Sequence, residues 1–113
     1  MNQVLKNEYN ISHRFWITSN NEAFLGKGRV ELLLKIQELG SLKQASEALK
    51  MSYRKAYYSI SHINKVADKP VVLIKRGGKN GGSSTITPHG LELIERFQKL
   101  TKQFEGFIDE QSL

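Results

Sequence analysis

The stretch SLKQASEALKMSYRKAYYSISHINKVA, residues 41–67, contains two helix starts only eleven residues apart. Ser41 and Gln44 have the spacing of a capping box, so a short helix is predicted to begin there. Ser52 can cap a second, longer helix that reaches to about Ala67. Small residues in the first helix allow the second to approach closely. Residues 41–67 are therefore predicted to form a helix-turn-helix.

A hairpin and a long helix are predicted to follow. Pro70 stops the preceding helix, and residues 71–87 hold two β-rich runs on either side of a glycine-rich tip, which predicts a wing. Thr87 and Pro88 form an N-cap and first-position pair that opens a last helix over about 88–110. This order of elements is typical of a winged helix-turn-helix.

Further elements are predicted ahead of the helix-turn-helix. The alternating apolar residues of Tyr9–Thr18 predict a strand, which Ser19–Asn21 ends as a turn, and Ala23–Leu25 is expected to pair back. A helix follows over about Lys27–Leu39, and Gly40 closes it. This helix is apolar on more than one face, which predicts packing within its own domain and against a second subunit.

Length and composition indicate a single globular domain. The 113 residues include no cysteine, which excludes disulfides, thiolate zinc sites and a cysteine nucleophile, and indicates a reducing compartment. No stretch reaches the roughly 20 apolar residues that span a bilayer, and no signal peptide is recognisable. We therefore expect a cytoplasmic protein without a membrane partner. Its single domain, 1–113, is expected to be mainly α with a small β component.

Basic charge is concentrated in the middle of the chain. Residues 41–87 hold nine Lys or Arg against two acids, whereas residues 1–40 hold five against four and residues 88–113 three against five. A basic excess confined to the helix-turn-helix and the wing predicts a polyanionic partner, double-stranded DNA. A solvated basic face without a partner is the alternative.

The second helix of the helix-turn-helix is predicted to enter the major groove. Its predicted inward residues are Tyr53, Ala56, Ile60, Ile63 and Ala67. Its predicted outer residues are Arg54, Lys55, Tyr58, Ser61, His62 and Lys65, of which Arg54, Lys55 and Tyr58 are expected to contact base edges. Phosphate contacts are expected from Lys43, Ser52, Tyr53, Lys75, Arg76 and Lys79.

The glycine-rich tip has two other interpretations. Glycine N–H groups can cradle a nucleotide phosphate, but Gly78-Lys79 is followed neither by Ser or Thr nor by a helix, as a P-loop requires. A mobile loop without DNA contacts is the second alternative.

Patterns for catalysis and metal binding are absent from the sequence. His13, His62 and His89 are widely separated, and neither H-E-x-x-H nor G-x-S-x-G occurs. We expect no enzyme activity, no metal and no cofactor.

Five short segments resemble one family of regulators. They are Leu25–Arg29, Gly40–Ala45, Met51–Ala56, Gly77–Gly82 and Ile86–Gly90. Together they resemble the N-terminal, DNA-binding domain of the molybdate-responsive ModE-type transcriptional regulators, in a single-domain form. The G-S-x-x-x-A start is shared with LysR-type regulators. The resemblance covers nearly the whole chain and implies a prokaryotic-type regulator that dimerises through its first and last long helices.

A homodimer on an operator with two half-sites is therefore expected. The predicted interface residues are Leu33, Ile36, Phe97, Leu100, Phe104 and Phe107. Tyr57 departs from the tryptophan usual in the family, and Lys50 from a turn glycine. The family's molybdate-sensing domains would follow this one, and the chain ends at Leu113. We therefore expect no molybdate-binding domain and no binding of molybdate.

Two alternatives to DNA binding stay open. One is a winged-helix protein-interaction module that uses the long C-terminal helix. The other is RNA binding, although Tyr53, Tyr57 and Tyr58 are predicted to lie on a helix and not on a sheet that stacks bases.

Overall fold

The structure is a computed structural model, and it describes residues 9–77 and 82–111. Within these residues the elements are β1 (Ile17–Ser19), β2 (Glu22–Leu25), α1 (Lys27–Leu39), α2 (Leu42–Ala48), α3 (Tyr53–Val66), β3 (Val72–Lys75), β4 (Ser83–Ile86) and α4 (Pro88–Asp109). β1 pairs with β2, and β3 with β4, both antiparallel. The fold is thus mainly α with two small hairpins, and this confirms the predicted fold class.

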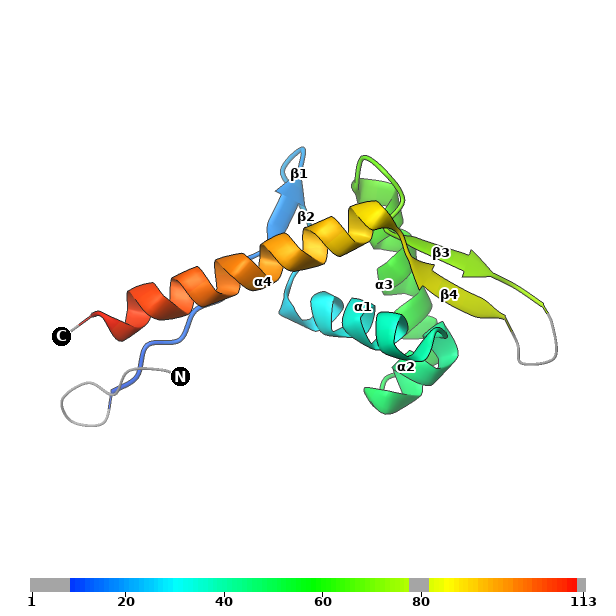
Figure 1. The fold of residues 1–113 in the computed structure, drawn as a ribbon, viewed down its shortest axis with the longest axis horizontal. Coiled ribbons are helices and arrows are strands. Elements are labelled where there is room, and N and C mark those ends of the chain that lie inside the picture. The colour runs from blue at the N-terminus through cyan, green and yellow to red at the C-terminus, as the bar shows by residue number, and fades with distance from the viewer. Residues whose placement is uncertain (1–8, 78–81, 112–113) are drawn as a thin grey trace.

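α1 lies in the middle of the molecule (Figure 1). α3 and the β3–β4 hairpin lie on one side of it. α4 crosses the fold, and its C-terminal half extends beyond the other helices on the opposite side, next to the N-terminal segment. The helix-turn-helix and the hairpin that follows it are therefore neighbours, as a winged helix requires.

The helix boundaries are set by caps that the sequence predicts. α2, α3 and α4 each begin with a hydroxyl that accepts a hydrogen bond from a backbone N–H three residues on. The pairs are Ser41–Gln44, Ser52–Lys55 and Thr87–Gly90. Gly40 ends α1 with φ 71°. Lys50 has φ 55° between α2 and α3, so a lysine occupies a left-handed position that glycine would adopt with less strain.

The N-terminal strand is much shorter than predicted. β1 covers only Ile17–Ser19, whereas Tyr9–Trp16 runs along α4. The ring centroid of Phe15 lies 4.5 Å from that of Phe97 and 4.9 Å from that of Phe104. The alternation of apolar residues therefore reflects packing of an extended segment on a helix, not pairing with another strand.

The predicted short hairpin is present, because β2 pairs with β1 through a tight turn. Asn20 and Asn21 both have positive φ, 50° and 66°, as two-residue hairpin turns require.

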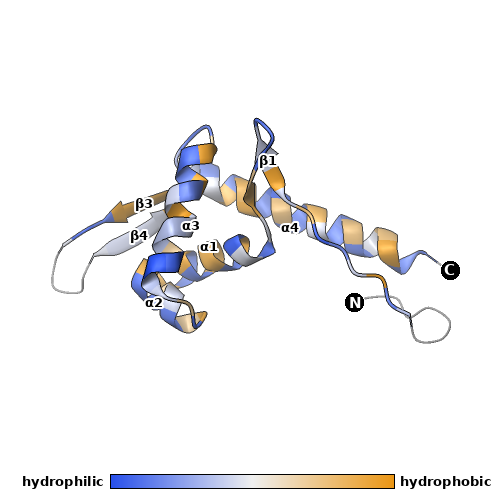
Figure 2. Cartoon of the chain, turned by 180° about the vertical axis from the view of Figure 1, so that it is seen from behind, coloured by the Kyte–Doolittle hydropathy of each residue, from blue (hydrophilic) through white to orange (hydrophobic). Residues whose placement is uncertain are grey.

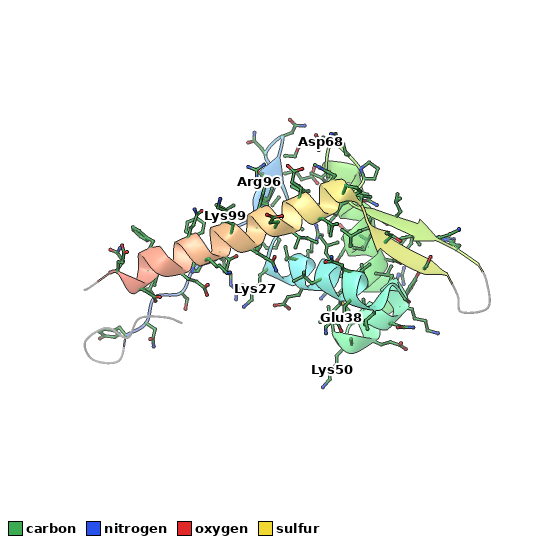
Figure 3. The ribbon with its side chains drawn as sticks, in the orientation of Figure 1. Lys27, Glu38, Lys50, Asp68, Arg96 and Lys99 are labelled. Carbon is green, nitrogen blue, oxygen red and sulfur yellow. The ribbon has the colours of Figure 1, made fainter. Side chains whose placement is uncertain are left out.

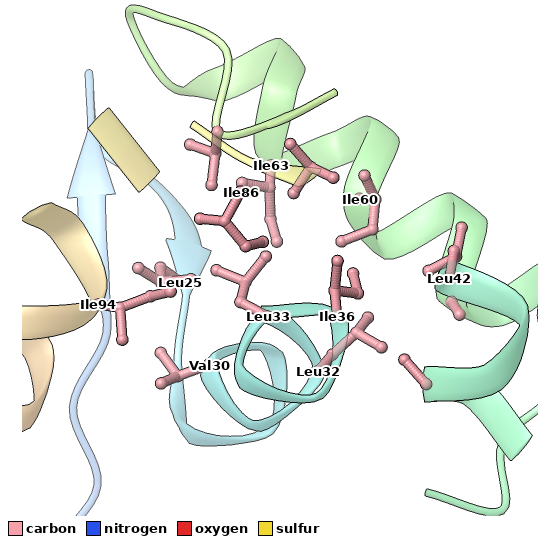
Figure 4. Close-up of a cluster of buried hydrophobic side chains, with 14 of the residues drawn as sticks. Leu25, Val30, Leu32, Leu33, Ile36, Leu42, Ile60, Ile63, Ile86 and Ile94 are labelled. Atoms are coloured by element: carbon pink, nitrogen blue, oxygen red, sulfur yellow. The ribbon is translucent and has the colours of Figure 1, made fainter. Parts of the chain in front are cut away.

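One hydrophobic core joins the helices and both hairpins. Figure 4 shows Val30 of α1 on the side of Ile94 in α4, and Leu32 on the side of Leu42 in α2. Leu33 and Ile36 lie in the same core and are 0% exposed. These side chains of α1 are thus covered by its own chain, whereas Leu34 is half-buried. The prediction that Leu33 and Ile36 contact a second subunit is wrong, because these side chains offer no surface to one.

The wing is fixed to the helix-turn-helix by buried and half-buried hydrogen bonds. Asn64 of α3 accepts from the N–H groups of Val71 (2.8 Å) and Val72 (3.1 Å), and its amide donates to the carbonyl of Val72 (2.9 Å). Ser84 of β4 accepts from the N–H of Leu42 at 3.1 Å. The base of the wing therefore has a defined position relative to α3.

Candidate nucleic-acid interface

The outer face of α3 is exposed over its N-terminal half. Arg54, Lys55 and Tyr58 are all exposed, and Tyr58 is 64% exposed. The opposite face of the helix buries Ala56 and Ile60 in the core. α3 thus presents two cations and an aromatic ring on a helix that the core holds rigidly, which is the arrangement needed to enter a major groove.

The first turn of α3 can meet a phosphate. Ser52 caps it, with its hydroxyl accepting from the N–H of Lys55 at 3.1 Å, and other N–H groups of the turn have no partner within the helix. Tyr53 is 49% exposed, so its predicted place on the inward face is wrong.

The wing brings further cations to the same region. Lys75 ends β3 and Arg76 follows it, and both are exposed, as is Lys43 on α2. Arg76 donates to the hydroxyl of Tyr57 at 3.0 Å, and its guanidinium carbon lies 5.7 Å from the centroid of that ring. Tyr57, in the position of the family's tryptophan, thus joins the wing to α3. Lys79 lies outside the described residues.

The two acidic residues of positions 41–87, Glu47 and Asp68, lie in different places. Glu47 is exposed on α2. Asp68 follows α3, and its Oδ1 lies 3.1 Å from Nε2 of His89 in α4. In Figure 3, Asp68 lies at the end of the fold opposite to Lys50, which marks the turn before α3. Asp68 therefore lies away from the start of α3, whereas Glu47 lies on the helix that precedes it.

His62 differs from the other predicted outer residues of α3. Its side chain is only 20% exposed, and both ring nitrogens contact other side chains, those of Arg29 and Glu22. His62 is therefore not free to contact bases, unlike the exposed Ser61 and Lys65. Sequence patterns could not find this contact, because the partners lie 33 and 40 residues away.

α4 exposes part of its apolar surface. Phe104 and Phe107 are exposed, the latter by 62%, and Leu100 is exposed by 37%. Hydrophobic residues recur along the whole helix, including the half that extends past the other helices (Figure 2). Phe97 is 5% exposed, because Phe15 packs on it. The prediction that Phe97 contacts a second subunit is therefore wrong, for the same reason as for Leu33 and Ile36.

Two further observations concern residues 9–77 and 82–111. No group of three or more His, Asp or Glu side chains there is arranged to hold a metal ion. None of the helices in these ranges combines the length and apolarity needed to cross a membrane.

Similarity to curated proteins identifies the kind of domain. No family model matches the chain. The chain is 34% identical over 82 residues to the transcriptional regulator ModE of Haemophilus influenzae, which is 73% of the chain and 32% of that relative. It is also 30% identical over 94 residues to the DNA-binding transcriptional dual regulator ModE of Escherichia coli. This match covers 80% of the chain and 36% of that relative. The resemblance to the ModE-type regulators is confirmed.

A third relative has a different name. The molybdenum-pterin-binding protein MopB of Rhodobacter capsulatus is 36% identical over 94 residues, with 77% of the chain and 35% of the relative covered. The chain thus spans about a third of the length of the curated ModE-type relatives that it matches. The two ModE relatives are named as transcriptional regulators and not as enzymes.

Proposed function

We propose that this protein is a transcriptional regulator that binds double-stranded DNA sequence-specifically. The observation that carries the proposal is the exposed face of α3, with Arg54, Lys55 and Tyr58. This face lies beside the exposed cations Lys75 and Arg76 of the wing. The names of the ModE relatives support the same function. A DNA partner implies a cytoplasmic location, which is part of the proposal. No molybdate site and no catalytic role are assigned to this chain.

Each exposed group has a role in this proposal. Arg54, Lys55 and Tyr58 contact base edges in the major groove, because a guanidinium can donate two bonds to guanine and an aromatic ring can contact the thymine methyl. The remaining groups contact the phosphate backbone and fix the register of the protein on the duplex. They are Lys43, Ser52, Tyr53, Lys75, Arg76 and Lys79.

The protein acts as a homodimer on two half-sites in this proposal. Leu100, Phe104 and Phe107 are exposed apolar side chains on α4, and a group of such side chains marks a protein-interaction surface. A groove of about 350 Å³ lies between α1 and α4 and is lined in part by Leu34, Gln98 and Thr101. A second copy that covers α4 and this groove would bury both.

Salt dependence of duplex binding tests the proposal. If the protein contacts six to ten phosphates, raising the salt concentration from roughly 50 to 200 mM should lower its affinity for a duplex by a factor of about 10³ to 10⁵. A protein-interaction module that uses the exposed phenylalanines of α4 is the second candidate, and its binding would be far less sensitive to salt. An RNA duplex that outcompetes a DNA duplex of equal length would favour RNA.

A further inference from the structure

Three charged or titratable side chains from separate elements meet beside the C-terminal half of α3. Arg29 of α1 contacts Nδ1 of His62 through Nη1 at 2.7 Å. Nε2 of His62 lies 2.7 Å from Oε2 of Glu22 in β2. The same Nη1 of Arg29 donates to the carbonyl of Phe24, also in β2, at 3.0 Å. One hydrogen-bonded chain therefore joins the N-terminal hairpin, α1 and α3.

The chemistry of arginine fixes the proton on His62. A guanidinium has donors but no acceptor, so Nδ1 must accept the bond from Arg29. The ring proton is then on Nε2, from which it is donated to the carboxylate of Glu22. The chain runs in one direction, from Arg29 through neutral His62 to Glu22, and each member holds the next in a single orientation.

The middle member of this hydrogen-bonded chain, His62, contacts a residue of the proposed DNA interface. The ring of Tyr58 stacks on His62, with centroids 6.2 Å apart and an angle of 15° between the planes. Because His62 is held at both nitrogens, it gives Tyr58 a fixed surface to lie against. We propose that Arg29, His62 and Glu22 are positioning residues that hold α3 and the Tyr58 ring in the orientation in which they bind DNA. This inference rests on the proposed function.

Direct contact of these residues with DNA is less consistent with the structure. Glu22 would repel phosphate, and both nitrogens of His62 are already engaged. Arg29 is only partly exposed and has two partners inside the protein. Their effect on DNA binding must therefore pass through α3 and Tyr58.

A pair of variants at Glu22 separates the effect of its hydrogen bond with His62 from the effect of its negative charge. Glu22→Gln and Glu22→Ala both remove the negative charge, but only glutamine keeps an oxygen that accepts from Nε2 of His62. We expect Glu22→Ala to bind a duplex recovered by selection from a random library about threefold to tenfold more weakly than Glu22→Gln, the range expected for one hydrogen bond. Anisotropy titrations well below both melting temperatures measure this difference. Equal affinities would overturn the inference.

A second pair tests Arg29 in the same way. Arg29→Met removes both bonds of Arg29, whereas Arg14→Met removes the same charge from the exposed N-terminal segment. Arg29→Met should lower the affinity by at least about tenfold relative to Arg14→Met, since two bonds are lost. An equal loss in both would mean that only charge matters, and would contradict a positioning role.

A spectroscopic measurement tests the hydrogen bonds of Arg29, His62 and Glu22 without DNA. Nitrogen-15 spectra of the full chain above neutral pH should show His62 with its proton on Nε2 and a bare Nδ1, and Arg29→Met should change the Nδ1 resonance. A proton on Nδ1, or an unchanged resonance in the variant, would overturn the inference. If the wild type binds no duplex, the proposed function fails. If the wild type binds and the variant pairs do not differ, only the positioning role fails.

Discussion

Arg54 and Lys75 are both exposed cations, but α3 and the wing would meet different parts of a duplex. We expect Arg54→Ala to lose about 1–3 kcal/mol of DNA-binding free energy and to relax the sequence preference at a single base position, because a bidentate contact to a base edge is removed. Lys75→Ala should weaken binding to all sequences alike and reduce the salt slope by about one. Titrations with a duplex and its single-base variants measure both effects. A changed sequence preference in Lys75→Ala would show that the wing contacts bases.

Replacing each of two glycines of α4 by alanine should change the free energy of unfolding in opposite directions. A Cβ at Gly90 would lie 2.6 Å from the carbonyl oxygen of Val71, whereas a Cβ at Gly106 meets nothing within 4 Å. We expect Gly90→Ala to lower the free energy of unfolding, since strand and helix must move apart. Gly106→Ala should raise it by up to about 1 kcal/mol through helix propensity. Urea denaturation measures both, and a stabilised Gly90→Ala would contradict the close approach.

Local chemistry was predictable at the scale of single residues. Ser52, Thr87 and Gly40 were assigned their capping positions from neighbouring residues alone, because caps depend on three or four residues of sequence. The partners of His62 were not predictable, since Glu22 and Arg29 reach it only through the tertiary fold. Arg29 does lie in the L-G-x-G-R segment of the family resemblance, but that motif does not say what the arginine contacts.

At the scale of elements, Asn64 connects the wing to α3. Asn64→Ala removes three hydrogen bonds and leaves the N–H groups of Val71 and Val72 without their acceptor. We expect a loss of about 1–3 kcal/mol in the free energy of unfolding. Ser61→Ala, on the exposed face of the same helix, should change it by less than about 0.5 kcal/mol. Equal effects in chemical denaturation would mean that the wing base is held by other contacts.

The exposed part of α4 should control association. Replacing both Phe104 and Phe107 by Ser removes the aromatic surface that a second copy would cover, so the double variant should be monomeric where the wild type is a dimer. Leu73→Ser is the control, because Leu73 is similarly exposed but lies on the wing. Sedimentation equilibrium measures the mass. A monomeric wild type, or an unchanged double variant, would contradict the proposed dimer.

Hydrophobic periodicity gave the elements but not their partners. Leu33 and Ile36 belong to the apolar faces for which a second subunit is predicted, yet α2, α4 and β4 of the same chain pack against α1. Likewise, the alternation in Tyr9–Thr18 does not distinguish a paired strand from a segment packed on α4. A pattern records that a face is buried, and only the tertiary fold identifies what buries it.

For the whole molecule, the distribution of charge is the feature with the clearest functional consequence. The basic excess of residues 41–87 belongs to the helix-turn-helix and the wing. Of the two acids in that range, Asp68 lies beside His89, away from the start of α3, and Glu47 is exposed on α2. A duplex lying along α3 and the wing would therefore meet more cations than acidic groups. Long-range attraction of this kind supports binding but does not by itself select a sequence.

Selection from a random duplex library at about 150 mM salt, with the solution mass measured alongside, tests sequence-specific DNA binding most directly. We expect recovery of a palindrome whose half-sites lie about one helical turn apart, together with the mass of a dimer. Enrichment of no sequence, with binding that vanishes as the salt concentration rises, would contradict a sequence-specific regulator. It would leave the exposed helix α4 as the surface on which to seek a protein partner.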